Sequence, residues 1–165
     1  MYKEGNHNHY TEEEVRGIFK QQLESGNWQI NKAEFGNFCS LLSCLNTEFV
    51  DLLHNEIHIV ICSLERDERM ENKKMPCACI NLRDGEFLKA KKAVMVLSPY
   101  LLTLTFACNK LKKIFHEIAH FKRNHPMTDI DETTHKKNEQ EAEDLALKWL
   151  EEEIHHLNGI TSPRI

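Results

Sequence analysis

The sequence has no paired-cysteine motif. Its six cysteines include no C-x-x-C, and most of them lie in apolar runs, where a small buried residue is expected. The closest pair, Cys77 and Cys79, alternates along a predicted strand and is poorly placed to share a metal ion. We therefore expect the thiols to be reduced and to pack as core residues.

A long apolar run is also lacking. The first nine residues, M-Y-K-E-G-N-H-N-H, contain no apolar signal region. The longest uncharged run, residues 93–109, is short for a membrane span and is interrupted by Ser98-Pro99. We therefore expect a cytoplasmic protein with no membrane segment.

The chain has no excess of basic residues, since its net charge is −5. Two helices joined by a glycine-containing turn are predicted near the N-terminus, an arrangement that could suggest a helix-turn-helix. That segment is acidic, however, with four Lys and Arg residues against eight Asp and Glu residues over residues 1–53. We therefore expect no direct contact with nucleic acid and no binding to anionic membranes. The sequence does not indicate an oligomeric state.

The length of 165 residues predicts one domain, with a small helical appendage at most. We expect a disordered N-terminus over residues 1–10, a helical segment over 11–55, a core over 56–158 and a tail over 159–165. In the helical segment, Thr11 and Glu14 form a capping-box pattern ahead of a helix that ends near Glu24. A second helix is predicted from Lys32 to about Leu45, with a further turn or two after it.

From residue 56 the hydrophobic period changes from helical to alternating. This predicts three strands, at residues 57–62, 77–82 and 93–97, with loops at 65–74 and 83–86. Helical periodicity returns near Asn109, and a polar loop to about Lys136 separates two C-terminal helices. The expected fold class is α+β, with a small three-stranded antiparallel sheet.

The strongest motif is His116-Glu117-Ile118-Ala119-His120, a complete H-E-x-x-H. On a helix the two histidines lie one turn apart and can bind one metal ion, while Glu117 can act as general base on a water. Apolar residues at spacings of three and four support the helix. The motif also arises by chance on charged amphipathic helices, so the prediction needs a third ligand.

Glu139 is the best candidate for that third ligand. It lies three and seven residues before Ala142 and Ala146 on the next predicted helix, so all three share the inward face. A carboxylate on a buried face is costly unless it is paired or binds a metal. Two histidines and one glutamate are a typical catalytic zinc set that leaves the fourth position for water. Glu143 lies one turn beyond Glu139, whereas Glu141 is predicted to face solvent.

With these two helices, the chain resembles the ImmA/IrrE family of minimal zinc metallopeptidases over residues 57–150. The resemblance rests on F-H-E-I-A-H-F at Phe115–Phe121 and on E-Q-E-A-E-D-L-A at Glu139–Ala146. The second block is also similar to the E-x-E-A-D-x-x-A signature of HtpX-type membrane proteases, with Glu143 in place of Asp. The resemblance implies a zinc ion bound by a glutamate at Glu139, as in gluzincins, and a supporting role behind the ligands for Glu143.

The sequence departs from the family pattern at two points, and it does not fit the metzincin pattern. Ala119 stands where the family tends to have glycine, and the Leu-Met-Pro ending that often follows the glutamate helix is missing. A metzincin site is excluded because Arg123 and Pro126 occupy the positions of its glycine and third histidine. His125 is therefore interpreted as a loop residue or a contact to substrate or transition state.

The predicted function is zinc-dependent hydrolysis of a peptide bond, with an added substrate strand along the predicted strand at residues 93–97. The family resemblance implies a protein substrate such as a repressor or another regulatory protein. One alternative is a non-catalytic metal-binding sensor or protein-interaction module, against which the intact Glu117 argues. Another is a structural zinc domain in which His125 closes the fourth position.

Overall fold

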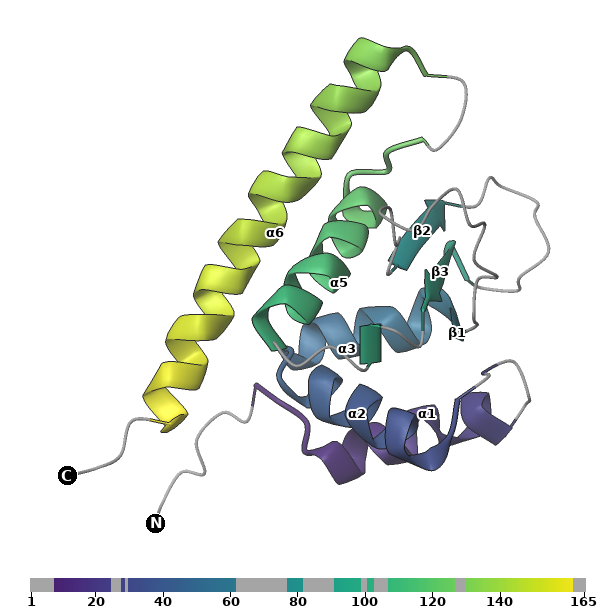
Figure 1. The fold of residues 1–165 in the computed structure, drawn as a ribbon, viewed down its shortest axis with the longest axis vertical. Coiled ribbons are helices and arrows are strands. Elements are labelled where there is room, and N and C mark those ends of the chain that lie inside the picture. Colours follow the sequence, from purple (N-terminus) through teal and green to yellow (C-terminus); the bar gives the residue numbers. More distant parts are fainter. Residues whose placement is uncertain are drawn as a thin grey trace.

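Figure 1 shows the computed structural model of the chain, in which the helices lie beside and below one small sheet. It describes residues 8–24, 28, 30–61, 77–81, 91–98, 101–102, 107–126 and 130–161. The elements in this part of the chain are α1 (Glu12–Glu24), α2 (Lys32–Ser43), α3 (Thr47–Asn55), β1 (Ile57–Ile61), β2 (Cys77–Asn81), β3 (Ala93–Leu97), α5 (Ala107–Lys122) and α6 (Glu132–Thr161). The predicted α+β class is confirmed, and the loops expected at 65–74 and 83–86 lie outside the described residues.

The first two helices begin where side chains cap them. At α1, the Thr11 hydroxyl accepts from Glu14 N at 3.2 Å, and the Glu14 carboxylate accepts from Thr11 N at 2.8 Å. Asn31 and Glu34 make the same reciprocal pair at α2, at 2.8 and 3.1 Å. Each pair satisfies backbone N–H groups that have no partner within the helix. The predicted capping box at Thr11 is therefore confirmed.

The sheet has the strand order β1-β3-β2 and is mixed. β2 pairs with β3 in antiparallel register, with Cys77 opposite Leu97. β1 and β3 are parallel, with Ile57 opposite Ala93, so the expectation of an antiparallel sheet is wrong for this pair. Hydrophobic alternation shows which face of a strand is buried but not its direction, and the long connection between β1 and β3 leaves room for a crossover.

β3 lies between the other two strands, so it offers no free edge. The expectation that a substrate strand adds along residues 93–97 is therefore wrong. The far edge of β1 is partly covered, because Trp28 forms a parallel bridge to Ile61 and its indole N–H donates to Ile59 O at 2.8 Å. Among the described strands, β2 is the outer one that packs next to α5 (Figure 1).

Residues 8–10 belong to the folded structure, in contrast to the disorder expected for residues 1–10. Thr47 N donates to Asn8 O at 2.7 Å, and His9 pairs with Asn46 in an isolated bridge. The His9 imidazole also lies 3.6 Å from the buried carboxylate of Glu153 on α6. These contacts tie the chain start to α3 and α6, and residues 1–7 lie outside the described part.

Among the described residues, one hydrophobic core includes side chains of the N-terminal helices and of the sheet and helices that follow them. On α5, residues at spacings of three and four are fully buried: Leu111, Ile114, Phe115 and Ile118. The Phe115 ring lies 5.0 Å from Phe49 of α3 and 5.8 Å from Trp149 of α6, between ring centroids. Phe49 and Trp149 are themselves 5.1 Å apart. This aromatic cluster joins α3, α5 and α6.

α6 is longer than predicted at both ends. It begins at Glu132, after Asp131 accepts from Thr134 N at 2.7 Å, and the expected loop to Lys136 is therefore helical. It also extends into the predicted tail as far as Thr161. The first turns are exposed and polar, so they carry no apolar periodicity from which a helix could be predicted.

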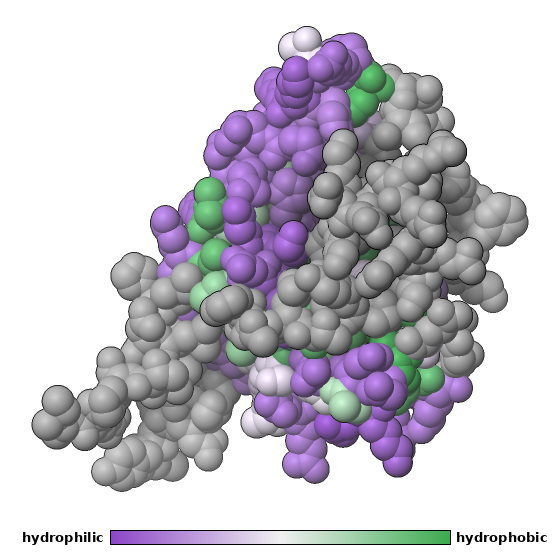
Figure 2. Space-filling model, viewed as in Figure 1, coloured by the Kyte–Doolittle hydropathy of each residue, from purple (hydrophilic) through white to green (hydrophobic). Residues whose placement is uncertain are grey.

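The surface in view is predominantly hydrophilic along α6 (Figure 2). In the described part of the chain, Leu147 is the exposed large hydrophobic residue, at 41%. No helix within the described ranges combines the length and the apolar character needed to cross a membrane.

The aromatic cluster should be a main determinant of stability. Phe115 is fully buried, so Phe115→Ala removes its ring contacts and leaves a cavity, and it should lower the free energy of unfolding by about 3–5 kcal/mol. The exposed Leu147→Ala on α6 is the matched control and should change it by less than about 0.5 kcal/mol. Urea unfolding followed by circular dichroism measures both. Equal losses would contradict the assignment of the cluster.

Candidate metal centre

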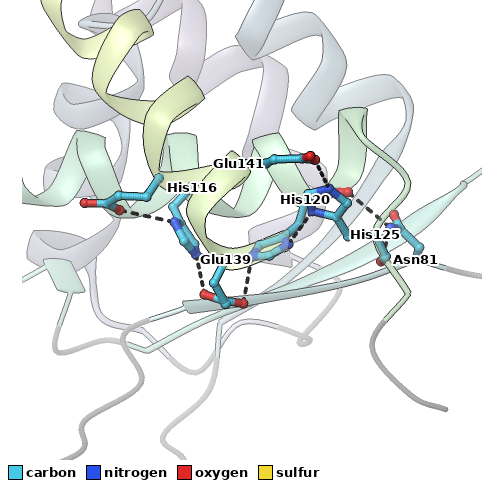
Figure 3. Close-up of polar contacts among 7 residues, drawn as sticks. Asn81, His116, His120, His125, Glu139 and Glu141 are labelled. Atoms are coloured by element: carbon cyan, nitrogen blue, oxygen red, sulfur yellow. Dashed lines mark hydrogen bonds and ion pairs between the residues drawn. The ribbon is translucent and has the colours of Figure 1, made fainter. Parts of the chain in front are cut away.

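His116 and His120 lie one turn apart on α5, with their rings on the same side of the helix (Figure 3). Their Nε2 atoms are 3.1 Å apart and their ring centroids 4.8 Å apart. The His120 side chain is 9% exposed and that of His116 is 20% exposed. The helix therefore brings the two imidazoles of the motif together at a partly covered position, as the four-residue spacing predicts.

Glu139 enters the site from α6 and spans both histidines. Its Oε2 lies 3.1 Å from His116 Nε2, and its Oε1 lies 3.2 Å from His120 Nε2. Ala142 and Ala146 are fully buried on the same face of α6. Glu139 is therefore directed toward α5 and the two histidines, but it is not buried as the helical phase predicts. Its side chain remains 44% exposed, so the centre is open to solvent on this side.

One ligand atom from each of the three groups lies within 4.8 Å of the other two. The closest pairs of atoms, at 3.1, 3.1 and 3.2 Å, use a different oxygen of Glu139 for each histidine, Oε2 for His116 and Oε1 for His120. A zinc ion with bonds of about 2.0–2.1 Å to nitrogen and oxygen keeps tetrahedral ligand atoms about 3.3–3.4 Å apart. His116, His120 and Glu139 thus form a group that could hold a metal ion, with two nitrogen donors and one carboxylate.

The electrostatics of His120 favour the form that binds metal. Burial lowers the pKa of its imidazole below the usual value, against the opposing effect of the Glu139 carboxylate, and His116 and His125 lower it further. Only the neutral ring has a lone pair free for a metal. The surroundings of His120 therefore maintain the ligand form at neutral pH.

Glu143 lies behind His116, one turn along α6 from Glu139. Its Oε2 is 3.4 Å from His116 Nδ1, and its other oxygen pairs with the Lys112 ammonium. The hydrogen bond from Lys112 lowers the pKa of Glu143, so the carboxylate stays ionised. An ionised carboxylate beside Nδ1 favours a proton there and leaves the Nε2 lone pair directed to the centre. The geometry is compatible with the supporting role that the family resemblance implies.

His125 lies behind His120, and a turn at the end of α5 puts it there. Asn124 has a positive φ of 53°, and His125 N donates to His120 O at 3.0 Å. Such a left-handed residue followed by a bond back across the last turn is the Schellman ending of a helix, which asparagine tolerates well. The turn directs the chain back, and the His125 ring packs beside His120, with centroids 5.1 Å apart.

Both ring nitrogens of His125 are engaged by protein groups (Figure 3). Its Nδ1 lies 3.0 Å from His120 Nδ1, and its Nε2 lies 3.1 Å from Glu141 Oε2. The residue is 6% exposed. This geometry does not favour the predicted contact with a substrate, nor a place for His125 as fourth ligand, because neither nitrogen faces the centre.

Two residues at the site, Glu141 and Asn81, are not predicted there by the sequence. Glu141 follows the pattern of a residue that faces solvent, but its carboxylate reaches His125, although its side chain is 43% exposed. Asn81, the last residue of β2, donates its amide N–H groups to His120 O at 3.3 Å and His125 O at 3.0 Å. The sequence signal for the contact between Glu141 and His125 is the Asn124-His125 pair after the helix. No sequence pattern indicates Asn81.

Glu117 is partly exposed on α5, directly after His116. The helix turns it about 100° from His116, away from the line that joins the two histidines. Its position as a neighbour of the centre, outside the ligand group, agrees with the motif.

Comparison with protein-family models, with curated proteins and with solved structures gives no match. The function has to be inferred from the site itself.

We expect the purified protein to contain one zinc ion per chain, and Glu139→Ala to lose it. With one of three donors removed, zinc affinity should fall by more than about 100-fold. Removal of a group that only hydrogen-bonds a ligand lowers affinity by at most about that factor. Glu151→Ala changes an exposed glutamate of the same helix and should bind zinc like the wild type. Elemental analysis and competition with a chelating dye measure both. Stoichiometric zinc in Glu139→Ala would place the ion elsewhere.

Proposed function

We propose that this chain is a zinc-dependent endopeptidase in which His116, His120 and Glu139 hold the ion. The convergence of one ligand atom from each residue, within 4.8 Å of one another on two packed helices, carries the proposal. A set of three protein ligands that leaves one position open is typical of catalytic zinc, whereas structural sites are closed by a fourth. The assignment agrees with the resemblance to the ImmA/IrrE family.

In this proposal, Glu117 is the general base. A zinc ion bound at the centre supplies a Lewis acid that polarises the scissile carbonyl and makes a nearby water more acidic. Glu117 accepts the proton of the attacking water and passes it to the amine nitrogen as the C–N bond breaks. Its place beside His116, but outside the ligand group, suits a residue that handles protons rather than binding the metal.

The substrate strand is proposed to lie along β2. An extended peptide binds a sheet edge through its main chain, and β2 is the outer strand next to the centre among those described. Asn81 at the end of β2 bonds to the backbone at both His120 and His125, which fixes this strand relative to the ligands. The position of the β2 edge relative to the proposed zinc ion is thus fixed.

A protein substrate follows from the same arrangement, since main-chain pairing along a strand requires an extended polypeptide. The family resemblance suggests a regulatory protein such as a repressor. Selectivity would come from the side chains that flank β2, because main-chain hydrogen bonds are common to all sequences.

The test of catalysis is Glu117→Gln. Glutamine keeps the size and the hydrogen-bonding capacity of the side chain but cannot accept the proton of the water. We expect this variant to keep its zinc and to lose peptide cleavage by at least about 10²–10⁴-fold. Cleavage of a proteome-derived peptide library, read by mass spectrometry, measures the activity on many candidate substrates at once.

The control is Glu151→Gln, which should cleave the same peptides as the wild type because Glu151 is exposed and distant in sequence from the motif. Equal cleavage by Glu117→Gln would exclude Glu117 as the base. A wild type that holds zinc but cleaves nothing would favour the metal-binding sensor or interaction module over the peptidase.

A further inference from the structure

The two proposed histidine ligands have different surroundings on the side away from the centre. His116 has a carboxylate next to its Nδ1, since Glu143 lies 3.4 Å away. Among the described residues, no carboxylate lies next to His120 Nδ1; a second imidazole occupies that place, with His125 Nδ1 at 3.0 Å. Glu141 lies on the other side of His125, with its Oε2 3.1 Å from His125 Nε2. The row His120–His125–Glu141 therefore ends in a carboxylate, as the shorter row His116–Glu143 does.

The proton positions along the longer row follow from one condition. If the Nε2 lone pair of His120 points to a metal ion, its ring proton is on Nδ1. That N–H can then only donate to His125 Nδ1, which must be unprotonated. The proton of neutral His125 is consequently on Nε2 and is donated to Glu141 Oε2. Each donor meets an acceptor, and no other arrangement of neutral rings satisfies all three groups while His120 binds a metal.

We propose that Glu141, acting through His125, positions His120 as a metal ligand. The inference rests on the metal centre of the proposed function. A hydrogen-bonded carboxylate behind a ligand histidine fixes the ring orientation and the tautomer and makes the ligand nitrogen more basic. Here a buried imidazole transmits this effect over one additional hydrogen bond.

Several contacts hold this row in place. His125 is 6% exposed and His120 is 7% exposed, so water competes little for the hydrogen bond between them. The Asn81 amide bonds to the backbone oxygens of both residues, at 3.3 and 3.0 Å. The Schellman turn at Asn124 fixes the direction of the chain between them. Three elements, β2, α5 and α6, thus contribute to the orientation of one imidazole.

Glu141 and Glu139 reach α5 by different routes. Two residues apart on a helix they are separated by about 200°, so they cannot lie on one face. Glu139 contacts His116 and His120 directly, whereas Glu141 contacts His125 in the turn after α5. α6 therefore supplies three carboxylates: Glu139 as a proposed ligand, Glu143 behind the ligand His116, and Glu141 behind His125, which contacts the ligand His120.

The experiment measures metal affinity of the folded protein, which does not depend on turnover. Cobalt and zinc binding are followed by the visible absorption of bound cobalt and by competition with a chelating dye. Glu141→Ala should lower affinity by about 10–100-fold, the range for loss of a supporting carboxylate, and should alter the cobalt spectrum. Glu141→Gln should restore most of the affinity, because its amide oxygen can still accept from His125 Nε2. Glu151→Ala is the control and should match the wild type.

A double-mutant cycle tests whether Glu141 acts through His125. His125→Phe keeps a ring of similar size but has no nitrogen, so Glu141→Ala should cost no further affinity in that background. An equal further loss would show that Glu141 acts directly on the ion by its charge, and would overturn the proposal. If His125→Phe does not fold, the comparison of Glu141→Ala with Glu141→Gln still tests the proposal, since Glu141 is partly exposed. A Glu141→Gln variant whose metal affinity is as low as that of Glu141→Ala would overturn the proposal.

The outcomes also separate this inference from the metal centre on which it rests. A wild-type protein that binds neither zinc nor cobalt would remove the centre and the inference with it. A wild type that binds metal, with Glu141→Ala of the same affinity and spectrum but lower thermal stability, would make the row a structural contact and would overturn the inference alone.

Discussion

The packing of α6 on α5 is the contact on which the candidate centre depends. Ala119 on α5 and Ala142 and Ala146 on α6 are fully buried, and such small residues allow the helices to approach closely. The aromatic cluster joins the same helices through Phe115 and Trp149 and fixes their relative position. A shift of α6 by one turn, about 5.4 Å, would remove Glu139 from both histidines. Hydrophobic contacts thus set the geometry of the polar groups.

Much of this site could be predicted because it follows from the geometry of a helix. The spacing of His116 and His120 puts two rings on one side of α5, and the phase of Ala142 and Ala146 directs Glu139 toward α5. Both inferences need only 3.6 residues per turn and a buried face. The strands can be predicted for a similar reason, because alternate residues of β1 and β3 are buried.

Other features could not be predicted because they depend on long-range pairing or on single turns. The parallel pairing of β1 and β3 depends on how the chain crosses between them, and a period of two is the same in either direction. Glu141 follows the rule for an exposed residue of α6 and is partly exposed, yet it contacts His125. That contact arises because the turn at Asn124 directs the chain back, which is a property of one backbone angle. Asn81 comes from a different part of the chain altogether.

The arrangement also has a consequence for how the protein reaches its native state. Apart from Asn81, the described side chains at the centre come from the stretch between Lys112 and Glu143, on α5, on α6 and on the turn after α5. Contacts between neighbouring segments need little loop closure and form rapidly, whereas the β1–β3 pair joins segments separated by β2 and has to wait for a longer search. The helical hairpin is therefore expected to assemble its ligands before the β1–β3 pair forms.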